Sequence, residues 1–396
     1  MLVFYLGFIC YIPYGLLDRT MFVEVFATPV HAVMLACKAA ALAFFALRLV
    51  LMRYTHEQFL VLCALGLLCV VSFRMTASWV PVWLFLFVSG GRGANVRVLA
   101  GISLAISAVV LMATVAAGVV GLLPSVVFPG RGAFATRTSL GFIHPNSLGF
   151  VCFSCAVSFM TLMRGRPALH WLPLVLLLFC ITTFVADSRT MTIAFVLLFL
   201  FALFERVPDD RKRLLRIGYL VAFLLMVCAS IYYMYFFSWS SGFDVGLNEY
   251  LSRRLSYANA YTSLYPVTPL GRNFLAGLVG PNLGSLLPVI DNVYAYFLLQ
   301  FGLVPSLLVL GVMCALFVRG IHGRVDSLEL KNIAMFCIVG FSETICLRID
   351  CNFFLVAVSD VLFGPEPVRA PSSQRATHLA AAAITDTHMR GAEYGF

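Results

Sequence analysis

Apolar segments recur along almost the whole chain, and this recurrence restricts the fold more than any other feature. Runs rich in Leu, Val, Phe and Ala alternate with short polar stretches as far as about residue 364. Hydrophobic residues make up 61% of the chain and charged residues 11%, whereas soluble domains are about 45–50% apolar and about 25% charged. The composition therefore excludes a soluble enzyme, a secreted disulfide scaffold and a disordered chain, and it indicates a membrane protein.

The apolar sequence divides into twelve predicted membrane spans, because a span needs about 20 mostly apolar residues. Two of them, 76–89 and 190–204, are short, so ten spans with re-entrant pieces is the alternative. The N-terminus lacks a small-residue cleavage site and is predicted to be a first span rather than a signal peptide. The predicted spans lie near 1–17, 28–51, 57–73, 76–89, 98–122, 145–163, 171–186, 190–204, 217–237, 292–318, 331–348 and 351–364. The expected fold is an all-α polytopic membrane domain, 1–364, followed by a flexible tail, 365–396.

The basic residues of alternate loops predict the orientation, because cytoplasmic loops carry an excess of Lys and Arg. One set of short loops holds Arg53, Arg92, Arg97, Arg164, Arg166, Arg206, Arg211, Lys212, Arg213, Arg216, Arg319, Arg324 and Lys331. The other set is smaller and holds Arg19, Arg74, Arg131, Arg137, Arg189, Arg253, Arg254, Arg272 and Arg348. Both termini and the tail are therefore predicted to be cytoplasmic. The loop 238–290 is predicted to be external, and it is longer than a connector needs to be.

Six arginines on the predicted outer side are not required by topology. They are Arg131, Arg137, Arg189, Arg253, Arg254 and Arg272. A guanidinium group stays charged and binds phosphate oxygens bidentately, so this group of arginines suits a phosphate ligand at the membrane surface. The alternative is that several of them reach to the interface, pair with a nearby carboxylate or cap a helix. Because the basic residues are spread singly between apolar runs, they do not indicate nucleic-acid binding.

Three further residues at the predicted outer ends of spans and one within a span are candidates for chemistry. Pro145 suits the first turn of a helix, which would hold His144 at the helix entrance as a base or a donor to phosphate. Asp291 and Asn292 precede another span, where a helix cap is the alternative role. Glu343 lies in an apolar stretch, and an acid within a membrane segment is by default a candidate functional residue.

No metal or cofactor site is indicated by the sequence. The chain has 12 cysteines, all within apolar runs, where a thiol behaves as a small hydrophobic group. Cys152 and Cys155 form a C-x-x-C pair without a second Cys or His pair at zinc spacing. There is also no P-loop and no aspartate pair of the metal-dependent glycosyltransferase type.

Taken in chain order, the polar motifs of the predicted outer side form one pattern. The pattern runs through R-x-x-L-G-F-x-H-P-N (Arg137 to Asn146), S-R-T (Ser188 to Thr190), R-L (Arg254-Leu255), L-G (Leu270-Gly271), D-N-x-Y (Asp291 to Tyr294) and Glu343 with a later Asn352. It resembles the Wzy-type polysaccharide repeat-unit polymerases, the capsule and exopolysaccharide branch of the O-antigen polymerase and ligase superfamily. The resemblance covers roughly residues 20–364.

The resemblance implies a metal-independent glycosyltransferase at the outer face of the bacterial cytoplasmic membrane. Such enzymes transfer a growing glycan from undecaprenyl diphosphate to a sugar hydroxyl of a new lipid-linked repeat unit, and they work beside a flippase and a chain-length regulator. Arginines in a water-poor cleft would stabilise charge that develops on the diphosphate. The implied diphosphate and substrate ligands are the six arginines with Asn146, Ser188 and Asn292. The implied base is His144, with Asp291 or Glu343 as alternatives.

Three other functions compete with the polymerase. A ligase of the same superfamily would attach the finished glycan to a lipid or protein acceptor. A transporter or lipid-linked oligosaccharide flippase would carry charge at mid-membrane depth and often shows internal symmetry, whereas the polar motifs here gather at one predicted face. A membrane scaffold without chemistry is the last alternative.

Overall fold

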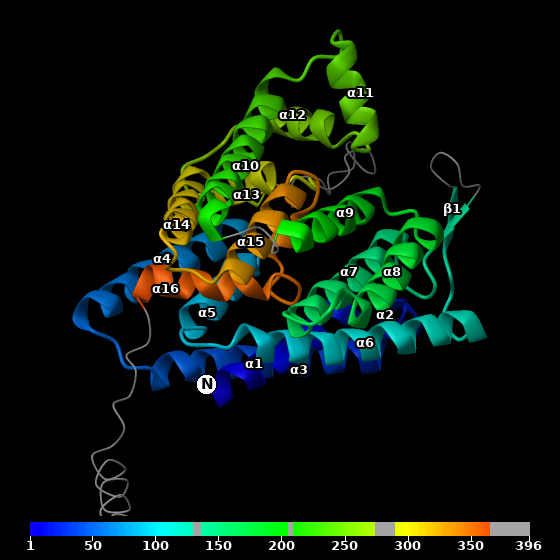
Figure 1. The fold of residues 1–396 in the computed structure, drawn as a ribbon, viewed down its shortest axis with the longest axis horizontal. Helices are drawn as coiled ribbons and strands as arrows, with labels where there is room; N and C mark the ends of the chain where they lie inside the picture. The colour runs from blue at the N-terminus through cyan, green and yellow to red at the C-terminus, as the bar shows by residue number, and fades with distance from the viewer. Residues whose placement is uncertain (130–135, 205–208, 274–289, 365–396) are drawn as a thin grey trace, which may run out of the picture. The chain divides into compact units, whose positions relative to one another are not determined.

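The structure is a computed structural model, and it describes residues 1–129, 136–204, 209–273 and 290–364. Residues Met1–Gly364 form one compact unit of helices (Figure 1). The predicted tail 365–396 and the candidate Arg131 lie outside the described residues.

Six helices of the described chain are long and apolar enough to cross a membrane. They are α3 (Ala27–Leu51), α4 (His56–Thr76), α6 (Val96–Val120), α7 (Pro145–Leu162), the Arg211–Phe236 part of α10 (Asp209–Phe236) and α14 (Leu303–Ile321). Shorter apolar helices are α1 (Leu2–Leu17), α5 (Val80–Gly90), α8 (Leu172–Cys180) with a π-helical turn (Ile181–Val185), α9 (Arg189–Phe204), and α16 (Ala357–Phe363) with the 3-10 turn Phe353–Val356 before it. The predicted all-α membrane class is therefore confirmed, and the count of twelve spans stays a prediction.

The remaining elements are short. They are α2 (Phe22–Val25), α11 (Gly242–Tyr250), α12 (Arg254–Leu264), α13 (Val293–Phe301), α15 (Ser327–Val339) and the 3-10 turns Ala168–His170 and Thr344–Leu347. Strands β1 (Val127–Pro129) and β2 (Thr136–Thr138) form an antiparallel pair in which Phe128 faces Arg137. Helices α11 and α12 belong to the predicted loop 238–290, so this segment has helical structure of its own.

Capping side chains fix where several of these helices begin. Thr55 and Gln58 form a capping box at the start of α4, in which each side chain bonds the other residue's backbone N–H. Asn95 caps α6 and Asn292 caps α13, so the helix-cap role considered for Asn292 is confirmed. The first N–H groups of a helix have no partner within it, and these side chains supply one.

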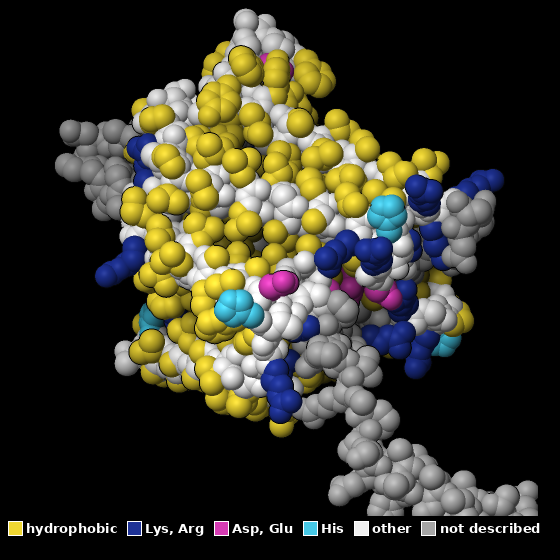
Figure 2. Space-filling view, turned by 90° about the vertical axis from the view of Figure 1, so that its left-hand side faces the viewer, with side chains coloured by type: hydrophobic (Ala, Val, Ile, Leu, Met, Phe, Trp, Pro, Cys, Tyr) yellow, Lys and Arg dark blue, Asp and Glu magenta, His cyan; other side chains and the backbone are white. Residues whose placement is uncertain are grey.

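Aromatic side chains form part of the buried core of the unit, and many large hydrophobic side chains are exposed on its outside. Phe4, Phe8, Phe45 and Phe87 are all fully buried, and their ring centroids lie 5.4–6.3 Å apart where they pair. Large aliphatic side chains are exposed along the long helices. Figure 2 shows one such face, where hydrophobic side chains cover a broad area and Lys and Arg gather in groups beside it. A surface of this extent suits a hydrocarbon environment.

Motifs that are far apart in the sequence lie at the same end of the helical unit, because the helices run in opposite directions. The first turn of α9 contacts Arg254, which in turn contacts the segment that follows α15. Asn292 donates to Ser230, near the end of α10, at 2.9 Å. At the opposite ends of the helices, Arg164 after α7 meets Asp326 before α15 at 2.8 Å. Helices α7 and α9 therefore begin where α10 and α15 end.

Two glycines allow close backbone contact beside this end. Gly271, from the L-G motif, and Gly302, before α14, have φ angles of +82° and +86°. A Cβ atom on Gly302 would collide with the backbone N of Gly271, and one on Gly271 with the carbonyl O of Gln300. Only glycine adopts this conformation and spacing without strain.

We expect Gly302→Ala to lower the free energy of unfolding by at least about 1 kcal/mol, because the new methyl group meets backbone and the φ angle is positive. Gly311→Ala in the same α14 is the matched control, since nothing lies within 4 Å of a Cβ there. That control should be neutral or stabilising by up to about 1 kcal/mol. Thermal unfolding in detergent measures both, and equal melting temperatures would contradict the close contact.

Candidate functional site

Arg254 is the centre of a charged cluster at the common helix end. Its Nε lies 3.0 Å from Asp291 Oδ2, and its Nη2 lies 2.7 Å from Glu343 Oε1. Its Nη1 donates to the Thr190 hydroxyl at 2.8 Å and to the Ser342 carbonyl. The Arg254 side chain is 9% exposed, and Asp291 and Glu343 are 33% and 18% exposed. We call Arg254, Asp291 and Glu343 the ion triad.

The ion triad holds two carboxylates against one guanidinium. Burial lowers the pKa of Arg254, but Glu343 and Asp291 outweigh it and the pKa is raised. Burial and the nearby Glu343 raise the pKa of Asp291 and Arg254 lowers it, and together they bring the pKa to about 6. Desolvation disfavours a carboxylate, and a second carboxylate nearby adds repulsion. Asp291 is therefore poised to take or release a proton close to neutral pH.

A second charged cluster surrounds Phe150 in the first turns of α7. The Arg19 guanidinium lies 4.3 Å from the Phe150 ring centroid, and that of Arg348 lies 5.1 Å from it. Arg348 also binds the buried Asp350 through two hydrogen bonds of 2.9 and 3.2 Å. Both guanidinium groups gain from the negative face of the ring.

Arg19 connects this cluster with the ion triad. Its Nε is buried and has no hydrogen-bond partner among the described residues. Burial and the nearby Arg348 lower the pKa of Arg19 while Asp350 and Glu343 raise it, and the net result is a pKa of about 10. Glu343 is thus within electrostatic reach of Arg19. A buried cation without a full set of partners is costly, and an anionic ligand would relieve that cost.

His144 stands at the N-cap of α7, as the position of Pro145 predicts. Its Nδ1 accepts a hydrogen bond from the Asn146 backbone N–H at 3.0 Å. In a neutral imidazole one nitrogen accepts and the other donates, so this bond leaves the proton on Nε2. The Phe128 ring lies 5.0 Å from the His144 ring and 5.2 Å from the Arg137 guanidinium. His144 is therefore arranged as a donor rather than as a base.

The S-R-T motif packs directly on α7. A Cβ atom added to Gly149 would lie 3.0 Å from Ser188 Cβ, so a larger residue would require Ser188 to shift. Ser188 is fully buried, and its hydroxyl has no partner among the described residues. Arg189 begins α9 and is half-buried, and Thr190 next to it contacts Arg254. The motif therefore links α7 to the ion triad.

Three other predicted ligands, Asn146, Arg253 and Arg272, differ in burial and in hydrogen bonding. Asn146 Oδ1 is buried and has no partner within the described chain, as a group that awaits a polar ligand or a water molecule would. Arg253 is exposed, with a φ of +67° at the N-cap of α12. Arg272 donates to the Pro266 carbonyl at 2.6 Å. No contact between these two arginines and the ion triad is found in the described part of the chain.

Sequence reasoning missed Arg19, Arg348 and Thr190 as parts of the site. Arg19 and Arg348 entered only the count of loop charges, and neither belongs to a recognisable motif. One signal was present, because Arg348 and Asp350 are two residues apart in an otherwise apolar stretch. Charged residues in membrane segments pair with one another, so these two residues were candidates for an ion pair.

Among the described residues, no group of three or more His, Cys, Asp or Glu side chains is arranged to hold a metal ion. No family model, no curated protein and no solved structure matches this chain.

We expect Arg254→Met to lower the free energy of unfolding by about 3 kcal/mol, because it leaves two carboxylates without their shared cation. This loss is at the low end of the range of about 3–5 kcal/mol expected when a buried ion pair is broken, because Asp291 is partly exposed. The triple variant Arg254→Met/Asp291→Asn/Glu343→Gln should regain part of the stability. The neighbouring Arg253→Ala serves as control and should change little. Thermal unfolding in detergent tests this, and a triple variant no better than Arg254→Met would refute the triad.

The raised pKa of Asp291 predicts a pH dependence of stability. An Asp whose folded pKa exceeds the ordinary value of about 4 adds stability that is complete below that pH and is lost as the pH rises through the folded value. The melting temperature of the wild type should therefore fall relative to that of Asp291→Asn as the pH rises from 4 to about 6. Asp18→Asn, at an exposed site, should run parallel to the wild type. A parallel course for Asp291→Asn as well would contradict the shift.

Proposed function

We propose that this protein is a polysaccharide repeat-unit polymerase of the Wzy type. It would transfer a growing glycan from undecaprenyl diphosphate to a sugar hydroxyl of a new lipid-linked repeat unit, at the outer face of the bacterial cytoplasmic membrane. The observation that carries the proposal is the ion triad. Arg254, Asp291 and Glu343 come from three motifs far apart in the sequence, and they meet beside Thr190 of a fourth motif.

The proposed reaction needs one base and one set of cations. The acceptor hydroxyl oxygen attacks the anomeric carbon, the bond from that carbon to the diphosphate oxygen breaks, and the diphosphate keeps the electron pair. The hydroxyl proton passes to a carboxylate, for which Asp291 is suited by its raised pKa. Glu343 is the alternative base.

Arg254 then has a positioning role rather than the direct diphosphate contact that the sequence suggested. Its Nε and both Nη atoms already donate to protein acceptors. It orients both carboxylates and limits how far the pKa of Asp291 rises. The developing charge on the diphosphate is met by Arg19, Arg137 and Arg189, with His144 Nε2 as a neutral donor.

An apolar cavity beside the ion triad suits the hydrocarbon tail of the lipid carrier. The cavity has a volume of about 360 Å³ and lies between α4, α5, α10, α13 and α14. Its lining includes Val293 and Tyr294, which are two and three residues after Asp291 in the chain. A polyprenyl chain held there would leave its diphosphate near the charged helix ends.

The proposal also includes the membrane topology, with twelve spans and both termini in the cytoplasm. The site residues lie at the ends of α10 and α15 and the beginnings of α7 and α9, whereas Arg164, Lys212 and Arg216 lie at the other ends of the same helices. The positive-inside rule assigns the second group to the cytoplasm. The site would then face outward, within reach of the flippase and the chain-length regulator of such a pathway.

We expect Asp291→Asn, Glu343→Gln and Arg189→Ala to leave the protein in the membrane and to stop chain growth. Loss of the base or of a transition-state cation costs about 10²–10⁴ in rate. Cells that carry each variant in place of the wild type should accumulate single repeat units on the lipid carrier, measured by mass spectrometry. Arg53→Ala, at an exposed site away from the cluster, is the control and should keep normal polymer.

Other outcomes of this experiment point to other functions. Long polymer that is not attached to its acceptor would indicate a ligase. Repeat units confined to the inner leaflet would indicate a flippase. Normal polymer in all three variants would exclude the ion triad from catalysis.

A further inference from the structure

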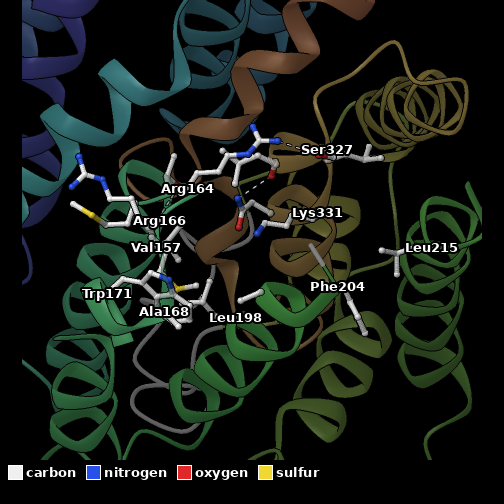
Figure 3. A pocket seen from close by; sticks show the side chains of 18 of the residues that line it. Val157, Arg164, Arg166, Ala168, Trp171, Leu198, Phe204, Leu215, Ser327 and Lys331 are labelled. Carbon is white, nitrogen blue, oxygen red and sulfur yellow. Dashed lines mark hydrogen bonds between the residues drawn. The ribbon is translucent and has the colours of Figure 1, made fainter. Parts of the chain in front are cut away.

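A basic pocket lies at the opposite helix ends from the ion triad. It has a volume of about 390 Å³ and is formed where α7 and α9 end and where α10 and α15 begin (Figure 3). Helix α7 has 18 residues, so at 1.5 Å per residue the pocket is roughly 27 Å from the His144 end. It is therefore separate from the proposed catalytic site.

Five of the residues that line this pocket are basic. They are Arg164, Arg166, Lys212, Arg216 and Lys331. None of the described lining residues is acidic. Arg164 is held by Asp326 at 2.8 Å and by the Ser327 hydroxyl at 3.2 Å, and Figure 3 shows it reaching Ser327 with Lys331 nearby. The Lys331 side chain is 6% exposed, so part of this charge is buried in the wall.

The remainder of the lining is apolar and aromatic. Leu198, Leu215 and Phe204 come from α9 and α10, and Trp171 comes from the segment between α7 and α8. Inorganic phosphate can contact only the basic residues of the pocket. A phosphate ester with a hydrocarbon chain can contact both the basic residues and the apolar wall. Trp is also typical of the level at which lipid headgroups meet hydrocarbon.

We propose that this pocket binds the headgroup of an anionic phospholipid. The phosphate contacts Lys212 and Arg216, which are four residues apart and share one face of α10. The glycerol and the first methylene groups lie against Leu215 and Phe204. Basic pockets between membrane helices at the cytoplasmic side are suited to such headgroups. The lipid thereby ties together the ends of four helices whose other ends lie on the side of the ion triad.

The test uses the full-length protein in zwitterionic detergent with three probes. They are phosphatidylglycerol, phosphatidylcholine and inorganic phosphate, each titrated while the melting temperature and the bound mass are followed. The pocket variant is Lys212→Ala/Arg216→Ala. The matched control is Arg211→Ala/Arg213→Ala, which removes the same charge from the same turns of α10 at positions that do not line the pocket.

We expect phosphatidylglycerol to bind and to raise the melting temperature, while phosphatidylcholine and phosphate do not. The pocket variant should raise the Kd for phosphatidylglycerol at least about tenfold, because it loses two charged donors. The control variant should keep the wild-type Kd within about threefold.

Three results would overturn the proposal. Equal weakening by the pocket and control variants would indicate attraction by net charge only. Equal binding of phosphatidylcholine would exclude headgroup selection. Binding of inorganic phosphate with the affinity of the lipid would indicate an anion site without a lipid role. None of these results depends on polymerase activity, so the lipid site and the proposed function fail separately.

Discussion

The sharing of one buried guanidinium by two carboxylates is the interaction on which the candidate site depends. Arg254 alone cannot neutralise Asp291 and Glu343, so the cluster keeps a net negative charge in a place where charge is costly. Burial and the neighbouring charge of Glu343 together raise the pKa of Asp291. Arg19 lies close enough to Glu343 to interact with it electrostatically, and Arg348, which acts on Arg19, is held by Asp350. The proton acceptor Asp291 and the cations Arg19 and Arg348 thus belong to one group of charged residues at this end of the unit.

That balance requires helix ends to meet in a fixed way. Glycines make the approach possible at Gly149 and at the Gly271–Gly302 contact, and Asn292 caps α13 while it donates to Ser230 of α10. Because α7, α9, α10 and α15 all run between this end and the basic pocket, the unit has two polar ends joined by apolar helices. The proposed catalytic site and the proposed lipid site therefore lie at opposite ends of the same four helices.

Several predictions from the sequence depended only on local chemistry, and the structure contains them. The helix start at Pro145 follows from the fixed φ angle and missing N–H of proline. The cap at Asn292 follows from its short amide side chain before an apolar run. The role of Arg254 could not be predicted in this way, because nothing in Arg253-Arg254 tells which of the two is buried. The structure buries Arg254 against the acids and leaves Arg253 exposed.

By itself the sequence determined that this chain is an all-α membrane protein, because 61% hydrophobic and 11% charged residues leave few other ways to remove apolar surface from water. It also determined which motifs are candidates for chemistry. Only the tertiary structure decided which of their side chains meet. Ion pairs between residues 37 and 89 positions apart depend on helix order and packing, which short-range periodicity does not encode. For the same reason Arg19 and Arg348 became part of the site only when the helices were assembled.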